Sequence, residues 1–137
     1  MVKGYWLRVI GYWLRVIGMF SFERLDVYQK ARELVKDVYQ LQKRFPMEER
    51  YELGNQIRRS IVSVSSNIAE GSGRDSYKEK IHFLEIAFGS LMESFSQLQN
   101  AQDLEYIYEE DVEKLRPQFE DIAKMLSGLK SSFEKKL

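Results

Sequence analysis

The 137-residue sequence has no cysteine and a single histidine, His82. The absence of cysteine excludes disulfides, thiolate nucleophiles and cysteine-based zinc sites. A single histidine excludes metal sites that need two or more imidazole ligands. The chain also has no net charge, with 21 basic and 21 acidic residues. That balance argues against a protein that coats nucleic acid by bulk charge alone.

The sequence contains no apolar run long enough to span a membrane, because Arg8 and Arg15 interrupt the first apolar stretch. The N-terminal residues also lack the charged, apolar and cleavage-site order of a signal peptide. We therefore expect no membrane association and a cytoplasmic location. The charge is unevenly spread: residues 43–80 are mildly basic, whereas residues 103–121 carry two basic and eight acidic residues.

The first 18 residues differ from the rest of the chain. Residues 4–10 read GYWLRVI, and residues 11–17 repeat them without change. Architectural repeats usually run 20 to 50 residues, so this one suggests a tandem duplication or an upstream extension of the reading frame. Two interpretations are open: an adventitious tail, or an aromatic, β-prone segment that binds a partner. We expect residues 1–18 to lie outside the fold and residues 19–137 to form one domain.

The remaining sequence predicts four amphipathic helices, over about residues 26–44, 48–70, 76–103 and 109–135. Asp26 and Gln29 resemble a capping box, and residues 71–73, GSG, predict a left-handed cap after the second helix. Pro117 predicts a kink or a later start of the fourth helix. Because the connections are short, we expect an all-α, antiparallel up-down-up-down four-helix bundle.

The predicted core consists of apolar residues that recur every three or four positions. In the first helix Leu34 and Leu41 are expected at the edge of the stripe. The stripes are Tyr28, Ala31, Val35, Val38 and Phe45; Ile57, Ile61, Val64 and Ile68; Ile81, Leu84, Phe88, Leu91, Phe95 and Leu98; and Val112, Leu115, Phe119, Ile122, Leu126, Leu129 and Phe133.

Three arginines are the candidate nucleic-acid contacts. Arg58 and Arg59 are adjacent in the second predicted helix, and Arg74 follows shortly after its end. Arginines near serines can grip phosphates through charge-assisted hydrogen bonds. The alternative is an ion pair within the chain or between subunits, with Glu70 taking one arginine.

A second apolar surface on the third helix is the candidate oligomer interface. Gly89 lies in the middle of this helix, where it weakens the helix unless a close approach compensates. An apolar face outside the core suggests self-association, and a broad core face is the alternative. The candidate interface residues are Phe83, Ile86, Ala87, Gly89 and Ser90.

Catalysis is not expected. No sequence feature places His82 beside a serine, and no glutamate lies three residues before it, as a di-metal bundle site requires. We expect His82 on a surface or in an interface. The predictions are no catalytic residue, no metal and no cofactor.

Several separated segments resemble one family. Residues 56–71, QIRRSIVSVSSNIAEG, are followed by Arg74 and by residues 83–94, FLEIAFGSLMES; residues 22–39, FERLDVYQKARELVKDVY, precede them. Together they resemble the four-helix-bundle proteins of the 23S ribosomal RNA intervening-sequence family over about residues 20–130. The matched motif positions include Arg58, Arg59, Asn67, Glu70, Gly71, Arg74, Gly89 and Ser90.

The resemblance implies a bacterial, non-enzymatic bundle that assembles into a ring of five subunits. It also implies association with ribosomal RNA or another nucleic acid. A related branch, the accessory proteins of diversity-generating retroelements, implies an alternative: a protein-interaction scaffold or an accessory subunit of a reverse transcriptase, with no direct RNA recognition. Those accessory proteins have a basic surface, whereas this chain is neutral, which lowers the expectation of salt-sensitive RNA binding.

Overall fold

The computed structural model describes Arg8 and residues 20–137. The duplicated N-terminal segment otherwise lies outside the described residues, so what we expect of it stays a prediction. The described chain is all-helical, without strands. It contains the 3-10 helices η1 (Ser21–Arg24) and η2 (Met47–Arg50) and the long helices α2 (Asp26–Gln42), α3 (Leu53–Ser72), α4 (Tyr77–Asp103) and α5 (Glu109–Glu134).

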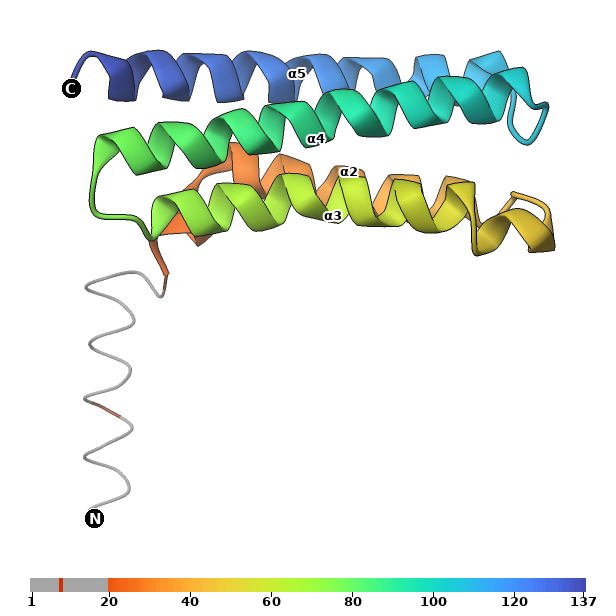
Figure 1. Cartoon of the computed structure of the whole chain (residues 1–137), viewed down its shortest axis with the longest axis horizontal. Helices are drawn as coiled ribbons and strands as arrows, with labels where there is room; N and C mark the ends of the chain where they lie inside the picture. Colours follow the sequence, from red (N-terminus) through yellow and green to blue (C-terminus); the bar gives the residue numbers. More distant parts are fainter. Residues whose placement is uncertain (1–7, 9–19) are drawn as a thin grey trace.

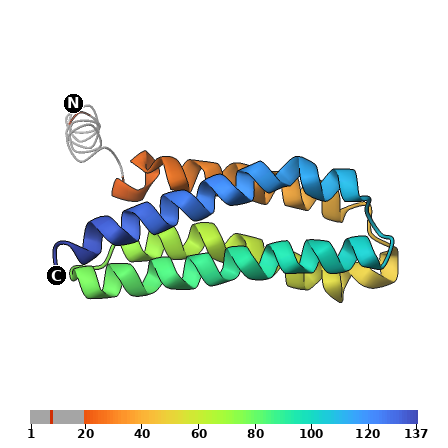
Figure 2. The same cartoon turned by 90° about the horizontal axis from the view of Figure 1, so that it is seen from above.

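The four long helices pack side by side as a bundle (Figures 1 and 2). α3 packs on α2 and α4, and α5 closes the arrangement by packing on α4 and α2. Figure 1 shows the connections at residues 43–52 and 104–108 at one end of the molecule and the connection at residues 73–76 at the other. Among the described residues, no helix has the length and apolar character needed to cross a membrane.

One core runs through the bundle, and most of the predicted stripes lie in it. Ile57, Ile61, Val64 and Ile68 of α3 are all at most 1 % exposed, as their spacing predicts. Burying a side chain of this size stabilises the fold by about 1.5 to 3 kcal/mol. In α5, Val112, Leu115, Phe119, Ile122 and Leu126 are buried, and Leu129 and Phe133 pack partly buried against the same core.

The buried face of α2 is rotated slightly from the predicted stripe. Val27, Leu34 and Leu41 are buried, whereas Tyr28 and Val35 are only partly buried. The predicted capping box at Asp26 is wrong, because Leu25 is the N-cap and makes no side-chain cap. The Gln29 amide instead donates to the Glu23 carbonyl at 2.9 Å.

The second long helix starts later than predicted, since η2 occupies its expected first turn. Glu52 has φ −104° and ψ −100°, which interrupts the helix before Leu53. At the other end, the predicted left-handed cap is wrong. Gly73 is right-handed, with φ −84°, and Gly71 lies inside the helix. A Cβ at Gly71 would stand 2.9 Å from Phe83 Cβ, so glycine there serves the close approach of α4.

The third and fourth predicted helices start close to where the sequence places them. Ser76 caps α4 by accepting from the Glu79 N–H at 3.1 Å. After α4, Glu105 adopts φ 66°, and the Tyr106 N–H donates back to the Ala101 carbonyl at 2.9 Å. This is a Schellman cap with glutamate at the position that glycine usually takes. α5 begins at Glu109, and its helical range includes Pro117.

Candidate nucleic-acid interface

The surface that carries the candidate residues is formed by α3 and α4, whose contact is lined by small polar side chains. Ser94 donates to the Ser60 hydroxyl at 2.8 Å, and Ser60 donates to Gln97 Oε1 at 2.7 Å. The chain of hydrogen bonds continues from Gln97 Nε2 to Glu93 at 3.2 Å. Hydrogen bonds of this kind fix which residues of two helices face each other.

A second set of hydrogen bonds joins the same helices one turn further along. The Ser63 and Ser90 hydroxyls lie 2.8 Å apart, and Asn67 Nδ2 donates to Ser63 Oγ at 2.9 Å. Ser60, Ser90, Ser94 and Gln97 are buried, and no buried side-chain polar atom of the described residues lacks a partner. Two of the α3 serines, Ser60 and Ser63, are therefore used for packing against α4.

Arg59 lies on the ridge of α3 between two surface grooves. On one side it lines a groove with Gln56, Ser63, Ser90 and Glu93 of the α3–α4 surface. On the other side it lines a groove that continues to Tyr39, Asn55 and Ser66. Its side chain is exposed, and no hydrogen bond or ion pair within the described chain engages it. Its guanidinium is available to an external anion.

Arg58 has a different environment from its neighbour. Its guanidinium donates to the Gln42 side chain at the end of α2, and to the Arg50 carbonyl at 2.8 Å. These bonds tie α3 to the α2–α3 connection. Arg58 is thus a structural residue whose donors are partly occupied, in contrast to Arg59.

Arg74 is also engaged within the chain. It forms an ion pair with Glu70, one turn earlier, and its guanidinium lies 4.7 Å above the centre of the Phe83 ring. The predicted alternative of a Glu70 ion pair is therefore confirmed for this arginine.

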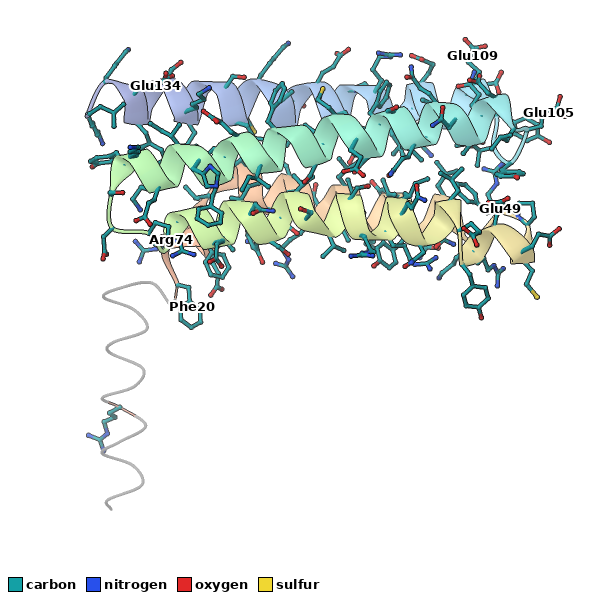
Figure 3. All side chains as sticks on the ribbon, viewed as in Figure 1. Phe20, Glu49, Arg74, Glu105, Glu109 and Glu134 are labelled. Atoms are coloured by element: carbon teal, nitrogen blue, oxygen red, sulfur yellow. The ribbon has the colours of Figure 1, made fainter. Side chains whose placement is uncertain are left out.

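The structure does not gather the three arginines into one cluster. Arg59 and the end of α3 at Ser72 are thirteen residues apart, or about 20 Å along the helix. Figure 3 shows Arg74 at the same end of the bundle as Phe20, opposite to Glu49. Of the three candidates, Arg59 is the one whose guanidinium has no partner within residues 20–137.

The five candidate interface residues divide between the inside and the outside of the bundle. Ala87 is fully buried and Ser90 is hydrogen-bonded to Ser63, so placing these two on an external face was wrong. They face α3 because their small side chains permit the close contact. Phe83 lies against Gly71 and under Arg74. Ile86 is 37 % exposed, and nothing lies within 4 Å of a Cβ built at Gly89.

Two further apolar residues lie on the exterior of α4. Phe88 is 37 % exposed and Met92 is 42 % exposed. Phe88 was predicted in the core because it continues a three-and-four spacing with Leu84 and Leu91. The buried row instead joins Leu84, Leu91 and Leu98 to the small residues Ala87, Ser94 and Ala101, which take the place expected for Phe88.

His82 is exposed on α4 and contacts the Phe83 ring edge-on at 5.5 Å. The hydroxyls of Ser60, Ser63, Ser90 and Ser94 hydrogen bond to one another and to backbone or amide groups. Among the described residues, no group of three or more histidine, aspartate or glutamate side chains could hold a metal ion.

No curated protein matches this chain. The 23S rRNA-intervening sequence protein family matches residues 23–128, a range that contains all of α2, α3 and α4 and all but the last turns of α5. The match extends over more than half of the chain, and the protein belongs to the 23S rRNA-intervening sequence protein family.

Proposed function

We propose that the protein is a non-enzymatic, homo-oligomeric, antiparallel up-down-up-down bundle that associates with ribosomal RNA or another nucleic acid. Family membership supports the association with ribosomal RNA genes or their transcripts. The observation that carries the proposal is the exposed Arg59, which lies between two grooves and has no hydrogen-bond or ion-pair partner among the described residues. An arginine in this setting can contact a phosphate without first breaking an internal ion pair.

Self-association is proposed through the outer surface of α4. Ile86, Phe88 and Met92 are exposed there, and Gly89 leaves room for a close approach by another helix. The resemblance supports a ring of five copies. Light scattering over a concentration series measures the assembled mass, and a monomer at the highest concentration would refute this part of the proposal.

RNA binding is tested with structured ribosomal RNA fragments across a salt series. Arg59→Ala should weaken binding and lower the slope of log affinity against log salt by about 0.7 to 0.9, the loss of one phosphate contact. The matched control is Arg32→Ala, which removes an exposed arginine from α2. Equal affinity of the Arg59→Ala and Arg32→Ala variants, or no binding at low salt, would contradict the proposal.

A protein scaffold is the second candidate function, including an accessory subunit of a reverse transcriptase. The charge of residues 103–111 favours it, because this segment carries five acidic residues and no basic one, and a surface of that sign repels phosphate. Copurification of one specific protein without RNA would support the scaffold over RNA binding.

A further inference from the structure

The end of the bundle formed by two connections exposes large apolar side chains. Apart from Phe20 and Leu137 near the ends of the described chain, the four most exposed large apolar residues all lie here. Met47 and Tyr51 belong to the α2–α3 connection and are 69 % and 81 % exposed; Leu104 and Tyr108 belong to the α4–α5 connection and are 54 % and 69 % exposed. We call these four residues the end surface.

The two connections are joined to each other. The rings of Phe45 and Tyr106 lie 5.7 Å apart, and the Arg44 guanidinium lies 5.6 Å from the centre of the Tyr108 ring. Partial burial, with a hydrogen bond to Glu49, raises the pKa of Tyr106. Figure 3 shows Glu49, Glu105 and Glu109 at this same end. The end surface is therefore one region of the molecule.

Residues 43–52 and 103–111, at this end of the bundle, carry eight acidic and three basic residues. Of the three cations, Lys43 is exposed, Arg44 is bound to Asp111 at 2.8 Å, and Arg50 donates to a backbone carbonyl. A partner that is complementary to this surface must carry positive charge and large apolar side chains. RNA does not meet this requirement, because its phosphates are negatively charged. The acidic residues that form no ion pair within the described chain are Glu48, Glu49, Glu52, Asp103, Glu105, Glu109 and Glu110.

The chain itself contains a segment with this chemistry. Residues 1–22 carry Lys3, Arg8 and Arg15 and no acidic residue, and they contain both tryptophans of the chain. The segment presents the same aromatic and cationic unit twice, and the end surface has apolar residues on two connections. We propose that residues 4–17 of one copy bind the end surface of a second copy.

Binding of the second repeat, residues 11–17, to the end surface of its own copy is excluded by reach. Phe20 lies at the opposite end of the bundle from Glu49 and Glu105 (Figure 3), and the 27 residues of α4 span about 40 Å between these ends. Trp13 is seven residues from Phe20, a span of about 25 Å when fully extended. The second repeat therefore cannot reach its own end surface.

The contact joins copies head to tail, because Phe20, which follows the segment in the chain, and the end surface lie at opposite ends of each protomer. It rests on the self-association proposed above and adds a contact separate from the outer surface of α4. Loss of the segment contact would leave an α4-mediated assembly intact.

The experiment uses tryptophan emission of the full chain, because Trp6 and Trp13 are its only tryptophans and both lie in the segment. We expect blue-shifted emission at high concentration and a red shift on dilution. Glu105→Lys with Glu109→Lys should shift the emission to the red and raise the concentration of half-assembly about tenfold. Arg8→Glu with Arg15→Glu should do the same, and the four changes together should restore the wild-type emission.

The control is Glu33→Lys with Glu120→Lys, which makes the same charge change on exposed sites of α2 and α5. Three results would overturn the proposal: emission equal in the control and the end-surface variant, no restoration in the combined variant, or blue-shifted emission that does not change on dilution. If all variants assemble as the wild type does, the proposed self-association is supported and the proposed segment contact is contradicted. If the wild-type chain stays monomeric, both the self-association and the segment contact are contradicted.

Discussion

The contact between α3 and α4 and the contact between α4 and α5 use different side chains. The first is made by hydroxyl and amide groups at hydrogen-bond distance, with Gly71 against Phe83. The second is aromatic and apolar: the rings of Phe95 and Phe119 pack edge to face at 5.1 Å, with Arg116 over Phe95 at 4.8 Å.

The two contacts illustrate two different contributions to the stability of the fold, apolar burial and hydrogen bonding. Burial of apolar surface supplies most of the free energy of folding but has little directionality. Satisfied polar groups contribute less to the net stability, yet each requires its partner at a defined place. We therefore expect substitutions on the α5 side to cost more stability, and substitutions on the α3 side to be more sensitive to shape and to partner.

The largest effect is expected from Phe119→Ala. This residue is 3 % exposed, so truncation removes buried surface and leaves a cavity, at a cost of about 3 to 5 kcal/mol in the free energy of unfolding. Urea unfolding followed by circular dichroism measures it. Glu120→Ala, at the exposed neighbouring position, is the control; a loss below 1 kcal/mol for Phe119→Ala would contradict the comparison.

Gly71→Ala should destabilise the bundle by about 1 to 3 kcal/mol, because the added methyl group would meet Phe83 Cβ at 2.9 Å. Gly89→Ala is the matched change in α4. Nothing in the described part of the chain lies within 4 Å of a Cβ built at Gly89, so the change should stabilise the protein by up to about 1 kcal/mol. Thermal unfolding of the two variants should therefore shift in opposite directions, and shifts of the same sign would refute the close α3–α4 approach.

Ser94→Ala should cost about 1 to 2 kcal/mol, since it removes the donor to Ser60 in a fully buried place. A double-mutant cycle with Ser60→Ala isolates the coupling between the two hydroxyls. Ser96→Ala, exposed on the same helix, serves as the control and should change stability by less than about 0.5 kcal/mol. Additive effects of the Ser60 and Ser94 changes would show that the hydrogen bond does not couple the helices.

The smallest effect is expected at Asp111, outside both contacts. Burial alone would raise its pKa, but the hydrogen bonds from Arg44 and the Tyr108 N–H outweigh burial and leave the pKa below its ordinary value. A lowered pKa stabilises the fold above the unfolded-state pKa, and this stability is lost as pH falls through the folded-state value. Asp111→Asn should thus cost about 1 kcal/mol at pH 7.

The pH dependence distinguishes this effect from a general loss of packing. The difference between Asp111→Asn and wild type should vanish at a pH below the lowered pKa, where the wild-type carboxyl is protonated as well. Urea unfolding at a series of pH values measures it, and a constant difference down to the lowest pH would contradict the role of the charge.

Much of the fold follows from apolar spacing alone. The spacing of Ile57, Ile61, Val64 and Ile68 predicts a buried stripe, and Ser76 marks the start of α4. The orientation of α4 was predicted less well, because its buried row includes the polar Ser94, whose hydroxyl bonds to Ser60 on α3. Hydrogen bonds between distant residues leave no periodic pattern.

The candidate site was predicted less well for the same reason. Arg58 and Arg59 are adjacent and chemically identical in the sequence, and only the fold assigns one to Gln42 and leaves the other exposed. The ion pair of Arg74 with Glu70 was predictable as an alternative, since the residues are four apart, but its stacking on Phe83 depends on the turn between α3 and α4.

The left-handed backbone at Glu105 has a consequence for engineering. A side chain at φ 66° is strained by roughly 1 kcal/mol relative to glycine. Position 105 is therefore a site where stability can be gained without touching the core. Glu105→Gly would relieve this strain and would also remove one negative charge from the end of the bundle. Thermal stability and surface charge can therefore be adjusted together at a single residue.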